Sequence, residues 1–292
     1  MRTTTDPNLR VQVDRAAGTI DVRQSAISAF MDCRRKFFYE YVMGIEPDYP
    51  DGPRPWTTAD TGTAFHEGMA AYYEGGSPER AVAEWFANQW PDETPEKDEM
   101  DLVRIMLEGH IEDLAAAGAD IGETTIAVEV PVIATVHDVD RWAVTVHGRV
   151  DRLIETDDGV RIIDDIKSVA SFAPIDNYIH QLGRYALLVR SGHDWRADRV
   201  RTTQVKRVKR TKDGPFFVRP WTPLSEDAYA TQAMNLRAVL RDMVRVIDSD
   251  GPWYEHYTGE CSWKCRVQDV CQAQMRGDDP ETIIELHYRK KQ

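Results

Sequence analysis

Apolar positions along the chain predict helices in its first part. From Ile27 to Tyr41 they recur at steps of three and four residues and include Cys33, which predicts one helix with Ser25 as its N-cap. A loop rich in Pro, Gly and Asp follows at 48–55. Three further helical patterns run over 61–75, 78–90 and 95–117.

Beyond Gly122 the pattern becomes one of strands. Segments rich in Thr, Val and Ile predict three consecutive strands, at 124–136, 142–154 and 160–166. A helix over 175–189 follows, then strands at 199–209 and 216–221 around a turn at 212–214, and a long helix over 223–247 that Thr222 could cap. We therefore expect an α/β fold forming one domain over residues 1–292. It would hold a helical insertion at about 61–118, a core at about 122–221, and a C-terminal helix with a cysteine-rich clasp at about 222–275.

Composition fits a folded protein with a sizeable core, because 42% of the 292 residues are hydrophobic. The first residues lack the apolar stretch of a signal peptide, and no apolar run approaches the length that spans a membrane. We therefore expect a soluble, cytoplasmic protein without a membrane partner.

The net charge of −13 argues mildly against a nucleic-acid partner. The segment 190–219, however, carries ten Lys or Arg against three acidic residues, so it is strongly basic within an acidic chain. This segment could be a local track for DNA or simply the solvated face of a hairpin, and the two interpretations weigh equally.

The most informative pattern is an acid on one strand followed by acid-x-lysine on the next. Asp151 ends one strand, and Asp165 and Lys167 lie on the following one. Because strand side chains alternate, Asp165 and Lys167 point to one face and Asp164 to the other. Carboxylates suit a hard cation such as Mg²⁺, and the lysine can orient a water for attack on phosphorus. Alone, a strand-end acid such as Asp151 is more often a turn or surface residue.

Two flanking features are weaker. Gln181 and Tyr185, four residues apart, share a face of the helix that follows; an ordinary amphipathic helix would also have this pattern. Glu129 on the first strand is a candidate for contact with DNA or with the metal ligands, and a plain cross-strand charge is an equal alternative.

Three motifs together resemble the RecB-type nucleases of the PD-(D/E)xK superfamily. They are Gly148-Arg149-Val150-Asp151, Ile163-Asp164-Asp165-Ile166-Lys167-Ser168 and Gln181-Leu182-Gly183-Arg184-Tyr185. Gly62-Thr63-Ala64-Phe65-His66 is similar to the upstream histidine motif of that family. The resemblance implies a mixed sheet with flanking helices in αβββαβ order, and it covers the chain from Ser25 to Cys271.

The resemblance also implies roles for individual residues. The metal, Mg²⁺ or Mn²⁺, would be held by His66, Asp151, Asp165 and the backbone carbonyl of Ile166. Lys167 would position the attacking water and stabilise charge on the phosphate. Gln181 and Tyr185 would orient the site or the DNA strand. The implied activity is a metal-dependent DNA exonuclease acting on single-stranded or end-containing DNA.

The cysteines are placed unevenly, with Cys33 far ahead of Cys261, Cys265 and Cys271. Four clustered thiols suit structural Zn²⁺ or a [4Fe–4S] cluster. One early and three late cysteines resemble the AddB nucleases and the CRISPR-associated RecB-like exonucleases, which implies a [4Fe–4S] cluster. The chain departs from that layout in having three residues, rather than two, between Cys261 and Cys265.

Two other function classes remain open. A DNA-binding adaptor of a recombination or CRISPR adaptation complex, with little or no catalysis, would have no need of a complete cation site. A zinc protein unrelated to nucleic acid would show zinc, no iron and no affinity for DNA. The chain lacks the Gly-x-x-x-x-Gly-Lys motif of a motor, so a helicase or a recombination protein is a possible partner.

Overall fold

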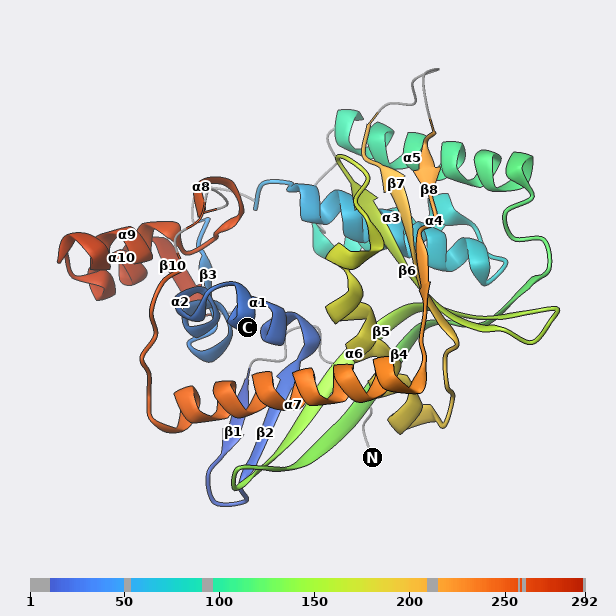
Figure 1. Ribbon diagram of the computed structural model, residues 1–292. Helices are drawn as coiled ribbons and strands as arrows, with labels where there is room; N and C mark the ends of the chain where they lie inside the picture. The colour runs from blue at the N-terminus through green and yellow to red at the C-terminus, as the bar shows by residue number, and fades with distance from the viewer. Residues whose placement is uncertain are drawn as a thin grey trace. The chain divides into compact units, whose positions relative to one another are not determined.

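The computed structural model describes residues 11–49, 54–90, 97–208, 215–256, 258 and 261–290 (Figure 1). The chain forms two compact units. Unit 1 comprises Met1–Arg54, Ile133–Gly148 and Thr231–Gln292, and unit 2 comprises Pro55–Val132 and Arg149–Ala230. The expectation of a single domain over 1–292 stays a prediction.

The N-terminal part of unit 1 pairs short strands with the first half of a long one. β1 (Gln12–Asp14) is antiparallel to β2 (Thr19–Arg23), and β2 runs parallel to β5 (Trp142–Thr156) with Thr19 opposite Ala143. Helix α1 (Gln24–Asp32) follows β2 directly.

The prediction of one helix capped by Ser25 is wrong. Arg23 is the N-cap of α1, and the backbone is extended at Cys33 (φ −160°, ψ 117°) before α2 (Arg34–Phe37) and the π-turn η1 (Phe38–Val42). The break therefore sets Cys33 apart from both helices, which the even spacing of apolar residues could not reveal.

The C-terminal part of unit 1 is built from short helices. α8 (Cys261–Lys264), α9 (Gln268–Arg276) and α10 (Pro280–His287) lead to β10 (Tyr288–Lys290), which pairs with β3 (Ile45–Pro47). A small core of Tyr39, Ile45, Val267 and Val270 lies beneath them.

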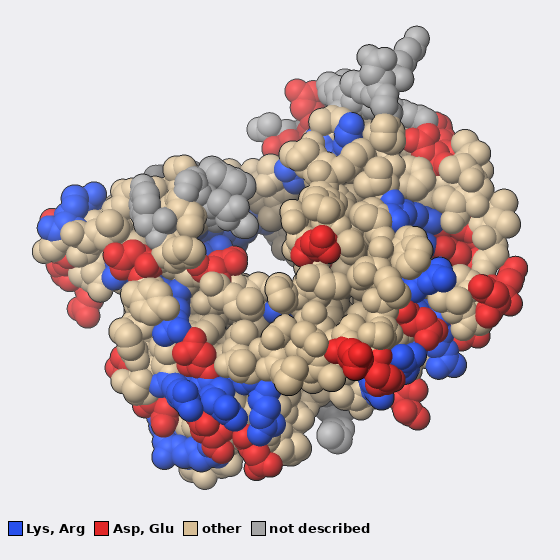
Figure 2. Space-filling model, in the orientation of Figure 1, with Lys and Arg blue, Asp and Glu red and all other residues tan. Residues whose placement is uncertain are grey.

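Helix α7 (Glu226–Asp248) carries basic side chains on its unit 1 portion, and Figure 2 shows Lys and Arg gathered over α7, β1 and β2 with acids between them. Arg245 pairs with Asp140 at 3.0 Å and Arg141 with Asp248 at 2.7 Å. These ion pairs fix α7 to the turn before β5, so part of this basic charge is already neutralised.

Three helices form the first part of unit 2. α3 (Thr58–Tyr73) begins with a capping box between Thr57 and Asp60, and α4 (Pro78–Gln89) begins with Ser77 accepting from the Arg80 N–H. α5 (Lys97–Ala117) crosses α3 closely at Gly68, where a Cβ would lie 2.6 Å from Leu107 Cδ1. A side chain at residue 68 would therefore force the Leu107 side chain to move.

The sheet of unit 2 is mixed, as predicted. The strands are β4 (Glu123–Val139), β5, β6 (Arg161–Val169), β7 (Arg199–Lys206), β8 (Phe217–Val218) and β9 (Trp221–Pro223). β5 and β6 are antiparallel, β6 and β7 are parallel, and β8 and β9 are antiparallel to β7. The parallel crossover from β6 to β7 contains η2 (Ile175–Asn177) and α6 (Ile179–His193).

One face of this sheet supports the insertion of α3, α4 and α5, which Figure 1 shows beside β6, β7 and β8. Ile166 and Val205 belong to a buried apolar cluster with residues of α3 and α5, among them Phe65, Met69 and Met106. α6 also contacts β6 and β7.

One helix boundary differs from the prediction. The last long helix begins at Glu226 and not at Pro223, because Trp221–Pro223 pairs with β7 and Ser225 Oγ accepts from the Ala228 N–H. The predicted turn at 212–214 lies outside the described residues. Within the described part of the chain, no helix combines the length and the apolar character needed to cross a membrane.

Candidate metal and active site

Three elements of unit 2 bring the predicted site residues together. β5 carries Asp151, β6 carries Asp165 and Lys167, and α3 carries His66. Arg152 lies opposite Asp164 in the β5–β6 ladder, so the register continued by one residue sets Asp151 opposite Asp165.

Asp151 is the centre of the contacts. Its Oδ2 lies 3.4 Å from His66 Nδ1 and accepts a hydrogen bond of 2.7 Å from the Ile166 N–H. Asp165 Oδ2 lies 2.8 Å from Lys167 Nζ. The Asp165 side chain is 2% exposed and that of Lys167 is 25% exposed, so the ammonium reaches the surface while the carboxylate is buried.

The charges at this site shift one another's pKa values. Burial raises the pKa of Asp165 to about 6. The Lys167 ammonium acts to lower this pKa, and the Asp151 charge acts to raise it. Burial also opposes ionisation of Asp151, but the neighbouring His66 outweighs it and lowers the pKa of Asp151. Burial disfavours a charged His66, yet Asp151 outweighs it, so the pKa of His66 is raised.

Lys167 stays protonated in this arrangement. Burial alone would lower its pKa, but Asp165 and Asp151 outweigh burial and raise it above its usual value. Lys167 is consequently a fixed cation and hydrogen-bond donor.

Glu129, left open between two interpretations by the sequence, lies at the site. One ligand atom each from His66, Glu129 and Asp151 lies within 4.8 Å of the other two. The backbone of Glu129 has φ +49°, a left-handed conformation that a non-glycine residue adopts at a cost of about 1 kcal/mol or more. The left-handed backbone interrupts the regular alternation of side chains along β4, and the Glu129 carboxylate lies beside His66. Strand alternation in the sequence could not have predicted this position of the carboxylate.

Glu129 is held by a neighbouring arginine. Its Oε2 lies 2.6 Å from Arg149 Nε. Burial, followed by the Asp151 charge, raises the pKa of Glu129 to about 7. Glu129 Oε2 and Asp165 Oδ2 are both buried oxygens, and each contacts one basic side chain, Arg149 and Lys167 respectively.

The helix after the acid-x-lysine strand borders the same site. Gln181 Nε2 donates to Tyr185 OH at 3.2 Å, and burial raises the pKa of Tyr185 to about 12, with Asp165 and Lys167 close enough to act on it. Sequence reasoning missed Tyr178, the N-cap of α6, whose pKa is raised by burial while Lys167 and Asp165 also act on it.

These donors fit a divalent cation. An imidazole nitrogen and carboxylate oxygens are the ligands that Mn²⁺ accepts, and the carboxylates also suit Mg²⁺. The predicted roles of His66, Asp151, Asp165, the Ile166 carbonyl, Lys167, Gln181 and Tyr185 remain predictions.

The four cysteines lie in unit 1 and line one cavity together with Lys36, His256 and Gln268. All four thiols are free, and each sulfur has an N–H donor. Cys33 accepts from the His256 N–H at 3.4 Å, Cys261 from Thr258 at 3.5 Å, Cys271 from Arg35 at 3.6 Å, and Cys265 from Val267. Burial raises the pKa of Cys265 to about 11. Four sulfurs that share a cavity and accept N–H donors fit a bound metal or cluster, which would stabilise their thiolates.

The model of the PD-(D/E)XK nuclease superfamily matches residues 23–272. A solved structure from Eubacterium rectale, described as a "putative exonuclease", aligns with a TM-score of 0.51 at 9% identity, covering 82% of this chain and 85% of that one. At this identity the likeness concerns the fold alone. The protein SSO0001 aligns over 90% of this chain and 89% of its own at 16% identity, but its TM-score of 0.41 carries no argument. No curated protein matches the chain.

Proposed function

The chain belongs to the PD-(D/E)XK nuclease superfamily, and from this we propose that it is a Mg²⁺- or Mn²⁺-dependent DNA exonuclease. The proposal rests on one observation above all: one ligand atom each from His66, Glu129 and Asp151 lies within 4.8 Å of the other two, and Lys167 lies 2.8 Å from Asp165 on the strand beside Asp151. A protein that only binds DNA would have no need of buried carboxylates beside an ammonium.

His66, Asp151 and Asp165 would hold the cation, with Glu129 adjacent. When bound, it supplies Lewis acidity, which activates a water and offsets charge on the phosphate. Lys167 donates its N–H groups to the water and to a phosphate oxygen, because its ammonium is fixed by Asp165 at 2.8 Å. Tyr185 and Gln181 border the ammonium and keep its position as the phosphodiester bond breaks.

The cysteine cavity would hold a [4Fe–4S] cluster with a structural role. Support comes from the four sulfurs that line one cavity and from their N–H donors. The ligands come from Cys33 and from Cys261, Cys265 and Cys271, so the cluster would close a loop of more than two hundred residues, which stabilises by about 5 kcal/mol in the polymer estimate. Iron and sulfide analysis after purification without oxygen tests this assignment, and zinc without iron would refute it.

A cleavage assay tests the activity. End-labelled linear DNA and a closed circular single strand are incubated with wild type in Mg²⁺, Mn²⁺ or EDTA. We expect the linear substrate alone to be degraded, and only with metal. Lys167→Ala should lose cleavage, whereas Lys290→Ala, which removes an exposed lysine of β10, should keep it. Binding of DNA without cleavage in either metal would favour an adaptor instead.

A further inference from the structure

Behind the proposed metal ligands, the opposite face of the unit 2 sheet carries a row of charges. The strand registers pair Arg152 of β5 with Asp164 of β6, and Asp164 with Arg201 of β7. All three are buried, with exposed fractions of 1%, 0% and 6%. An Arg–Asp–Arg row therefore crosses three neighbouring strands where a sheet face normally holds apolar residues.

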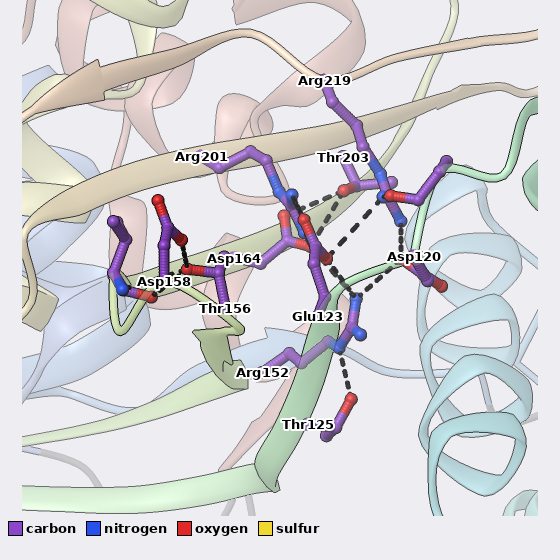
Figure 3. Close-up of polar contacts among 12 residues, drawn as sticks. Asp120, Glu123, Thr125, Arg152, Thr156, Asp158, Asp164, Arg201, Thr203 and Arg219 are labelled. Carbon is purple, nitrogen blue, oxygen red and sulfur yellow. Dashed lines mark hydrogen bonds and ion pairs between the residues drawn. The ribbon is translucent and has the colours of Figure 1, made fainter.

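Asp164 is the centre of this row (Figure 3). Its Oδ2 accepts from Arg201 Nη2 at 2.8 Å and lies 3.8 Å from Arg152 Nη1. Thr203 Oγ1 donates to its Oδ1 at 2.8 Å. Burial would raise the pKa of Asp164, but the Arg201 guanidinium outweighs burial and holds it at about 2. Asp164 is therefore charged at every pH at which the protein would act.

Two further acids and one arginine balance the row. Glu123 contacts Arg201 at 2.5 Å, and Asp120 accepts from Arg219 at 2.8 Å and Arg152 at 3.3 Å. Figure 3 shows these side chains converging from β4, β5, β6, β7 and the chain before β4. The network therefore has three arginines and three carboxylates. The Arg152 guanidinium also lies over the Tyr73 ring, 3.8 Å from its centre.

The row stands one residue away from the proposed metal ligands on both strands. Arg152 follows Asp151, and Asp164 precedes Asp165. The oppositely charged pair Arg152–Asp164 therefore lies on one face of the sheet, directly behind the carboxylates of Asp151 and Asp165 on the other face. Asp151 and Asp165 face each other across β5 and β6, and like charges directly opposite destabilise a strand pair. Buried ion pairs contribute little net stability, whereas fixing register is their best-attested use.

We propose that the Arg152–Asp164–Arg201 row positions Asp151 and Asp165 by locking the register of β5, β6 and β7. A slip of two residues would set Ile162 or Ile166 between the arginines and leave both guanidinium groups buried without the central carboxylate. A slip of one residue would turn Asp165 into the row and Asp164 toward the site. The inference rests on the proposed function in one respect, namely that Asp151 and Asp165 are metal ligands.

The Ile166 amide reports this register without any metal, because it donates to Asp151 Oδ2 at 2.7 Å. Amide hydrogen exchange would be measured by NMR on metal-free protein for Ile166 and for Leu188 in the core of α6. In Asp164→Asn we expect protection of Ile166, relative to Leu188, to fall about tenfold, which corresponds to one charge-assisted hydrogen bond. Mn²⁺ affinity measured by calorimetry should fall with it.

Leu240→Ala is the matched control, since Leu240 is fully buried in α7 and lies outside the apolar cluster that contains Ile166. It should lower the unfolding midpoint yet leave the Ile166 to Leu188 ratio and the Mn²⁺ affinity unchanged. Should Asp164→Asn fail to fold, Thr203→Val removes one hydrogen bond to Asp164 and no charge, and the ratio should fall about threefold.

An unchanged ratio in the folded variants would overturn the proposal and leave the row a stabilising network only. Failure of the proposed function has a different signature. In that case the wild type would not cleave DNA, although the Ile166 ratio would still respond to Asp164→Asn.

Discussion

Cation affinity should depend steeply on pH, because the proposed ligands are partly protonated when no metal is bound. Asp165, with a pKa of about 6, is about one-tenth ionised at pH 5 and about nine-tenths ionised at pH 7. This group alone makes Mn²⁺ binding about tenfold tighter at pH 7, a difference of about 1.4 kcal/mol. His66, whose pKa is raised, must also lose a proton and acts in the same direction.

Glu129 extends the effect to higher pH if it joins the ligands. With a pKa of about 7, its ionised fraction rises about tenfold between pH 6 and pH 8, whereas that of Asp165 only doubles. Glu129→Gln should therefore flatten the dependence of Mn²⁺ affinity on pH between pH 6 and pH 8.

The stability of the metal-free protein should depend on pH with the opposite sign. Because the pKa values of Asp165 and His66 are raised in the folded state, the free energy of unfolding falls as pH rises through them.

Calorimetry with Mn²⁺ from pH 5 to pH 8 measures this dependence, and buffers of different ionisation enthalpy count the protons released. Thermal unfolding with and without Mn²⁺ gives an independent measure, since stabilisation grows with the ratio of free metal to the dissociation constant. A dissociation constant that stays flat over this range would refute the assignment of these side chains as ligands.

Three further results are expected. Lys167→Met should abolish cleavage. It should bind Mn²⁺ at least as tightly as wild type in calorimetry, because the change removes a positive charge 2.8 Å from Asp165. Weaker Mn²⁺ binding would mean that Lys167 supports the structure of the site. Gly68→Ala should lower the free energy of unfolding, measured in urea, by about 1–3 kcal/mol. The double variant Gly68→Ala/Leu107→Ala should lose less than the sum of the two single losses, because the clash at 2.6 Å disappears. Strictly additive losses would contradict this contact. Cys271→Ser should lose iron and unfold at a lower thermal midpoint, while the protein that remains folded still cleaves DNA. A variant with full iron content would exclude Cys271 as a ligand.

The mixed sheet was implied by the family resemblance, whereas alternation along strands predicted the consecutive strands of unit 2 and the placement of Asp165 and Lys167 apart from Asp164. The strands and this placement depend on local periodicity, which the sequence records directly.

What the sequence could not supply depends on contacts between distant residues. The basic segment 190–219 offered a surface track, yet Arg201 is buried against Glu123, and Arg219 pairs with Asp120. Arg190 and Arg196 pair with Glu226. A count of charges does not reveal which of them face inward, because that is decided by acids from other elements.

Two local irregularities were equally hidden. The extended backbone at Cys33 interrupts a regular apolar stripe, and the left-handed backbone of Glu129 brings it beside His66. At both positions the expected regular element would have pointed the side chain in another direction. Tertiary contacts stabilise such conformations against local preference.

Anomalous diffraction from Mn²⁺-soaked crystals tests the central claim most directly. The account predicts one strong peak in unit 2, within about 2.3 Å of the His66 imidazole and of carboxylate oxygens from Asp151 and Asp165, with Lys167 beside it. Manganese bound elsewhere, with these three side chains free of it at saturating concentration, would contradict the account.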